Sequence, residues 1–250
     1  MQRKEEWLTT GVFLVMLVIV SISGFKLPHY LNIVFPATSV LVAAFIIQKK
    51  ENLKWIKSIF SIQLIIVGIL LLLGTVINAW AFPVKSIGVI IGVVVLLAVV
   101  FYFIKSDAYG RLQKALAVSV AAMIFSFFLL NSNFYPQLLT YQGGNELAHA
   151  VKGKLNPQDV YFWKNTFSSS FNFYTKSLYK LFADSALQPG KKVWLVYDIR
   201  DEAEIKQAGY QLGQRFSVLD YEITKLDIKF VTPATREKQC SIMVLAELSK

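Results

Sequence analysis

The sequence predicts a membrane all-α bundle of about five transmembrane helices, followed by a small α/β (α+β) extracytoplasmic domain. Hydrophobic residues make up 55% of the 250 residues, which is above the usual share of a soluble domain. The longest apolar runs all lie before residue 131. We therefore divide the chain into a transmembrane helical region, residues 1–130, and a soluble periplasmic domain, residues 131–250.

Five apolar runs carry the prediction of the membrane region. Each is about 17–22 residues long, which at 1.5 Å per residue is enough to cross roughly 30 Å of hydrocarbon. Pro36 and Pro83 lie near the starts of the second and fourth runs, where a helix tolerates proline best. The predicted spans cover residues 7–23, 31–47, 58–79, 84–104 and 112–130.

The distribution of basic residues predicts the orientation. Residues 1–130 contain 11 Lys and Arg against four acidic residues, whereas residues 131–250 contain 15 against 12. With the N-terminus in the cytoplasm, nine of these 11 basic residues face the cytoplasm, and only Lys26 and Lys85 lie in the outer loops. Because basic loops stay inside, we expect a multi-pass protein of the bacterial cytoplasmic (inner) membrane with a periplasmic or extracellular C-terminal domain.

The soluble region combines helix and strand signals. Asp201 and Glu204 form a capping-box pattern before a short helix at 202–208. Residues 138–151 also favour a helix after the Gly143-Gly144 break. Segments rich in β-branched and alternating residues predict strands at 160–163, 193–197, 216–224, 226–231 and 242–248.

Several function classes find no support. The net charge of +10 comes from the membrane loops, so it does not indicate nucleic-acid binding. Cys240 is the only cysteine, and His29 and His149 are far apart, so no disulfide and no metal site is expected. Phosphate-binding glycine motifs are absent, and we predict no cofactor.

The connector between the first two runs, residues 23–30, is the one polar cluster that we place at the outer membrane face. One interpretation is structural: Lys26 snorkels from a helix end, Pro28 ends the helix and Tyr30 joins the aromatic belt. The other is that Lys26 and Tyr30 bind an anionic lipid headgroup, since a lysine is a compact charge that suits phosphate.

Residues 26–36 read KLPHYLNIVFP. This segment resembles the K-L-P-x-Y-x-x-x-x-x-P segment of integral-membrane GT-C glycosyltransferases, in the branch of the lipid A aminoarabinose transferases and protein O-mannosyltransferase-like enzymes. The soluble region is similar to the periplasmic C-terminal domain of bacterial members in three segments: Tyr141–Ala148, Phe171–Thr175 and Lys229–Glu237.

The resemblance implies transfer of a sugar from a polyprenyl-phosphate carrier to an acceptor at the outer face. Lys26 and Tyr30 would then bind the phosphate of the membrane lipid, the polyprenyl-phosphate-linked sugar. His29 stands at a variable position of the motif and receives no catalytic role.

The chain departs from the family in one important respect. Family members have more spans and an external catalytic acid near the N-terminus, whereas this chain begins late in that pattern. All four acids of residues 1–130 fall on the predicted cytoplasmic side, although the transfer needs a carboxylate base. We assign no catalytic residue, and expect a C-terminal part that is incomplete alone and is completed by an N-terminal half or a separate catalytic subunit.

A non-enzymatic function is the alternative. The chain would then be a membrane-anchored envelope or accessory protein whose external domain binds a partner or a glycan.

Overall fold

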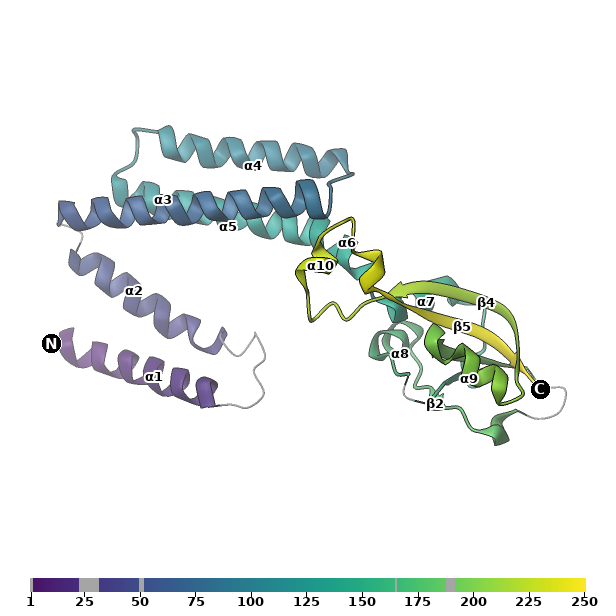
Figure 1. The fold of residues 1–250 in the computed structure, drawn as a ribbon. Coiled ribbons are helices and arrows are strands. Elements are labelled where there is room, and N and C mark those ends of the chain that lie inside the picture. Colours follow the sequence, from purple (N-terminus) through teal and green to yellow (C-terminus); the bar gives the residue numbers. More distant parts are fainter. Residues whose placement is uncertain (1, 23–31, 50–51, 165, 188–191) are drawn as a thin grey trace. The chain divides into compact units, whose positions relative to one another are not determined.

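A computed structural model describes residues 2–22, 32–49, 52–164, 166–187 and 192–250 (Figure 1). The chain forms two compact units. The first contains Met1–Ile69 and Val99–Ala121, and the second contains Leu70–Ala98 and Ala122–Lys250. Three long helices run through both units, and each unit is described by itself.

The first unit is all-helical. It contains α1 (Gln2–Ile22) and α2 (Phe35–Lys49), which contact each other, with parts of α3 (Leu53–Val76), α4 (Ile87–Lys105) and α5 (Arg111–Leu129). The Asn52 side chain caps α3 by accepting from the Trp55 N–H at 3.1 Å. Gln63 Nε2 donates to Ser119 Oγ at 2.5 Å and so links α3 to α5.

Three helices of the described chain are long and apolar enough to cross a membrane, which corrects the predicted five spans. They are Lys54–Ala81 (28 residues), Ile87–Lys105 (19 residues) and Arg111–Leu139 (29 residues). The apolar parts of α1 and α2, Trp7–Ile22 and Phe35–Gln48, are shorter. Helix α1 begins with charged residues, and α2 begins at Phe35 rather than Leu31, so its 15 residues rise only about 22 Å.

The exposed surfaces of the long helices are apolar, as expected of helices in lipid. Ile65, Leu72 and Val94, for example, are each at least 60% exposed, which is typical of a surface that faces lipid rather than water. Together with the three spans, these surfaces indicate a membrane protein.

In the second unit, both α3 and α5 end in a π-helix. Helix α3 continues as Ile77–Ala81, and α5 continues as Leu130–Phe134 before α6 (Tyr135–Leu139). The two π-helical segments contact each other. Both segments lie within the last residues of candidate spans, next to the sheet-containing domain.

The soluble domain is built on a five-stranded mixed sheet with strand order β2-β1-β3-β5-β4. Strand β1 pairs in parallel with both β2 and β3, and β5 pairs antiparallel with β3 and β4. The strands are β1 (Val160–Phe162), β2 (Lys180–Leu181), β3 (Val193–Asp198), β4 (Gln211–Asp220) and β5 (Ser241–Ser249).

Helices cover the two faces of this sheet. Alternate residues of β3 and β5 enter two different cores, which explains why both strands are almost continuously apolar. On one face Val196 and Leu245 pack with α7 (Gly143–Val151) and α8 (Ser169–Thr175). On the other face Leu195 and Val244 pack with Ile205 of α9 (Glu202–Gln207).

The sequence patterns predict most of these elements. Strands β1, β3 and β5 confirm three predicted strands, and β4 ends at Asp220 rather than reaching residue 224. The predicted strand at 226–231 is instead the short helix α10 (Ile228–Val231), because the Asp227 carboxylate caps it by accepting from the Lys229 N–H.

The predicted capping box before α9 is also wrong. Asp201 makes no side-chain capping bond, and Glu204 pairs with Lys164 instead. The carboxylate that caps this region is Asp198, which accepts from the Arg200 N–H at 2.9 Å.

Candidate functional site

The sequence-predicted site residues Lys26 and Tyr30 lie outside the described residues. The same holds for His29 and for the whole connector at 23–31. The proposed phosphate contact of Lys26 and Tyr30 therefore stays a prediction. The described residues of the second unit contain two other candidate features, a buried polar network and a surface groove.

The first feature is a polar network between the two π-helical segments. Asn133 Nδ2 donates to Asn78 Oδ1 at 2.9 Å and to the Phe82 carbonyl at 2.7 Å. Gln137 Nε2 donates to Asn133 Oδ1 at 2.8 Å. The Asn133 amide thereby satisfies the carbonyl of Phe82, the residue that directly follows the first π-helix. Asn78 and Asn133 are both buried.

Arg236 ties the far end of the sequence to this network. Its side chain is only 8% exposed, and it donates to the carbonyls of Ala81, Phe230 and Val231 at 2.6–3.0 Å. The guanidinium carbon lies 4.0 Å from the centre of the Phe82 ring. Arg236 forms no ion pair with a described carboxylate, so carbonyl dipoles and aromatic faces hold its charge.

Two of the segments that carry the family resemblance meet at this point. Tyr141, from the first segment, packs edge-on against Phe230, from the last, with ring centres 5.2 Å apart. Arg236 lies 5.6 Å from the Tyr141 ring centre. Tyr221 stacks on Phe230 at 3.7 Å. These contacts join the start of α7, the end of β4 and α10 to the end of α3.

A half-buried carboxylate, that of Asp220, lies beside this cluster. Asp220 accepts from the Gly143 N–H at 2.8 Å, and Gly143 needs to be glycine because a Cβ would stand 2.8 Å from the Asp220 side chain. Burial raises the pKa of Asp220 above its ordinary value, and the charge of Asp198 adds to the rise. Asp220 is a structural acceptor for the first turn of α7.

Three acids around α9 have basic partners. Arg200 lowers the pKa of Asp198 by a bidentate hydrogen bond. Glu202 pairs with Lys206, and Glu204 pairs with Lys164. Among the described residues, no group of three His, Cys, Asp or Glu residues is placed to hold a metal.

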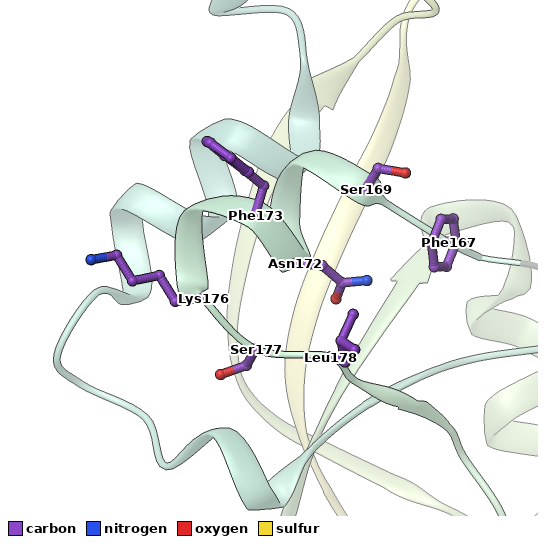
Figure 2. A pocket seen from close by; sticks show the side chains of 7 residues that line it. All are labelled: Phe167, Ser169, Asn172, Phe173, Lys176, Ser177 and Leu178. Carbon is purple, nitrogen blue, oxygen red and sulfur yellow. The ribbon is translucent and has the colours of Figure 1, made fainter.

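The second feature is a groove along α8, with a volume of about 470 Å³. Its walls include the exposed side chains of Phe167 and Leu178, and the Asn172 carboxamide lies between them (Figure 2). Asn172 is 9% exposed, and its Oδ1 is fully buried without a hydrogen-bond partner among the described residues. The remaining lining residues are Ser169, Phe173, Lys176 and Ser177.

Local sequence explains how α8 is placed. The Ser168 hydroxyl caps the helix by accepting from the Phe171 N–H at 3.2 Å, and Lys176 ends it in the left-handed conformation with φ 57°. Phe171 is fully buried against the sheet, which turns the next residue, Asn172, toward the groove.

Sequence reasoning missed both features. The segment Phe171–Thr175 entered only through its resemblance, and neither the Ser168 helix cap nor the buried Asn172 was predicted. The available signals were an asparagine between two aromatic residues and two asparagines, Asn78 and Asn133, near the ends of apolar runs.

No family model, no curated protein and no solved structure matches the chain.

Proposed function

We propose that the chain is the C-terminal part of a glycosyltransferase that moves a sugar from a polyprenyl-phosphate carrier to an acceptor at the outer face of the cytoplasmic membrane. The observation that carries the proposal is the meeting of two resemblance segments at the end of α3, through Tyr141, Phe230 and Arg236. Tyr141 and Phe230 are 89 positions apart in the sequence, so the two segments need such a contact if they are to shape one site.

The charges at the helix ends support this orientation. Lys105, Arg111 and Lys114 flank the connector between α4 and α5, and the start of α3 carries Lys54 and Lys57, whereas the opposite ends of these helices carry only Lys85 in their short loop. Because basic residues favour the cytoplasmic side, the soluble domain would lie outside. The same orientation follows whether or not α1 and α2 cross the bilayer.

The chemistry would be shared with another segment or subunit. Lys26 and Tyr30 would bind the carrier phosphate. The loop between α3 and α4 contains no acid, and the described Asp198, Glu202 and Glu204 are held in ion pairs. In this proposal the carboxylate base of the transfer comes from that other segment or subunit.

Donor binding tests the proposal. The full chain, reconstituted in vesicles, should bind a radiolabelled polyprenyl-phosphate sugar, and Lys26→Ala should weaken binding by roughly tenfold through loss of one charge on phosphate. Lys85→Ala is the matched control, because it removes the other outer-loop lysine. Unchanged donor binding by Lys26→Ala would refute the phosphate role. Sugar transfer by the purified chain alone would refute the incomplete site.

The groove on α8 favours a second candidate function, a membrane-anchored envelope protein whose external domain binds a partner. The buried and unpartnered Asn172 carboxamide is a binding feature that donor transfer does not require. The two functions differ in their dependence on Lys26, since partner binding at the groove should be unchanged by Lys26→Ala.

A further inference from the structure

The Asn172 carboxamide is a polar group that the fold leaves unpaired. Its Oδ1 accepts no hydrogen bond from a described residue, and its Nδ2 donates none. Leaving a buried carbonyl unpaired costs about 1–3 kcal/mol. A ligand that supplies one donor and one acceptor to this side chain would recover that cost, and a peptide group carries one of each.

A free strand edge follows the groove in sequence. Strand β2 is at the edge of the sheet, and no described strand pairs with its outer side. Leu181 is in register with Phe162 of β1, and the Phe162 carbonyl accepts from the Phe182 N–H at 2.7 Å. In a parallel ladder this register directs the N–H and C=O of Leu181 away from β1. They are available to a further strand.

The side chains around the groove and the β2 edge indicate which side chains an added strand would have. Phe167 and Leu178, which share the groove, and Leu181 of β2 are between 60% and 91% exposed. A groove with large exposed apolar side chains is typical of an interaction site. Lys176 and Lys180 are exposed, and neither forms an ion pair with a described residue. The groove has no acidic lining residue. An apolar residue flanked by acids fits these walls.

We propose that this surface binds an extended peptide segment of a partner protein. The peptide adds to β2 as a strand, one of its peptide groups pairs with the Asn172 carboxamide, and an apolar side chain enters the groove between Phe167 and Leu178. Acidic residues of the peptide face Lys176 and Lys180. Leu178 and Leu181 are three residues apart, roughly 10 Å of extended chain, so a short segment reaches both.

This inference rests on the second candidate function and names its ligand class. A peptide accounts for the observations better than a glycan does. A glycan would need several polar partners, whereas the groove offers one amide and the hydroxyls of Ser169 and Ser177 between apolar walls. A glycan would also make no use of the β2 edge. Strand addition with side-chain pockets is a general mode of peptide recognition.

The experiment uses the full chain in nanodiscs and a display library of short random peptides, with empty nanodiscs for counter-selection. Enriched peptides should have an apolar residue with Asp or Glu nearby. Asn172→Leu should weaken their binding by at least roughly tenfold while leaving the melting temperature unchanged or higher, because it removes an unpaired buried group without leaving a cavity.

Leu181→Pro tests the strand edge. Proline removes the outward N–H but leaves the bonds between β1 and β2, so peptide binding should fall by roughly tenfold. Leu181→Ala is the matched control, and it should weaken binding less. Ile228→Ala controls for an exposed apolar residue elsewhere, since Ile228 is 80% exposed.

Three results would overturn the inference. In the first, no peptide is enriched over empty nanodiscs. In the second, enriched peptides bind Asn172→Leu and Leu181→Pro as tightly as the unchanged chain, so that partner binding survives as a function but lies elsewhere. In the third, a glycan array gives a ligand that is lost in Asn172→Leu and retained in Leu181→Pro, which would identify the groove as a glycan site.

Discussion

Arg236 shows how one residue joins the soluble domain to a membrane helix within the second unit. Its planar guanidinium donates to three carbonyls and stacks on Phe82, a combination that an ammonium group does not reproduce. Arg236→Lys should therefore lower the free energy of unfolding of this unit by about 1–3 kcal/mol, measured by thermal unfolding in detergent. Arg215→Lys is the control, because Arg215 is exposed and its contact with Glu202 is 3.6 Å long. Equal losses in both variants would contradict the role of Arg236.

The raised pKa of Asp220 predicts that the stability of the folded protein depends on pH, and burial of the carboxyl group sets the sign of that dependence. Because burial raises its pKa in the folded state, the folded protein binds more protons than the unfolded chain just above the ordinary value of about 4. The free energy of unfolding then falls as pH rises through that range. Asp220→Asn keeps an acceptor for the Gly143 N–H and removes the charge. It should be more stable than the unchanged protein at pH 7, and the gain should shrink toward pH 4.

Thermal unfolding at both pH values checks the Asp220 prediction. Glu222→Gln is the matched control, since Glu222 is 61% exposed and should show no comparable gain. Asp220→Ala should lose stability at both pH values, because it leaves the Gly143 N–H unpaired. A gain for Asp220→Asn that is independent of pH would contradict the prediction.

At the scale of elements, the π-helical ends of α3 and α5 depend on their asparagines. Asn133→Leu would leave the Phe82 carbonyl and Asn78 Oδ1 with fewer donors, and should destabilise the protein by about 1–2 kcal/mol, the upper range for hydrogen bonds between membrane helices. Asn131→Leu is the matched control two residues away. Asn131 is exposed and bonds only within its own helix, to the Phe127 carbonyl. Thermal unfolding in detergent compares the two variants, and similar melting temperatures would contradict the prediction.

The elements also show what sequence patterns can and cannot predict. Strands β3 and β5 were predictable because their apolar, β-branched runs are local properties. The number of spans was overestimated because an apolar run predicts a helix but not its start: α2 begins only at Phe35. Contacts made by folding were not predictable at all. Neither the position of Arg236 on Phe82 nor the unpaired state of Asn172 follows from neighbouring residues.

At the scale of the whole molecule, both proposed functions require the soluble domain to lie on the side of the membrane opposite the connector between α4 and α5, which is flanked by Lys105 and Arg111. The chain allows a direct test, because Cys240 is its only cysteine and Cys240→Ser keeps a donor for the Arg236 carbonyl. In that background, Ser185→Cys places a thiol at an exposed position of the domain. Ala108→Cys places one at an exposed position of the connector between α4 and α5.

Labelling of intact cells with a membrane-impermeant maleimide should modify Ser185→Cys, since the positive-inside rule puts three spans between the cytoplasmic start of α3 and the domain. Ala108→Cys should react only after the cells are permeabilised. The Cys240→Ser background without a new cysteine reports unspecific labelling. The opposite labelling pattern would place the domain in the cytoplasm. It would contradict both proposed functions, because the transferase and the binding protein each need the domain on the outer face of the membrane.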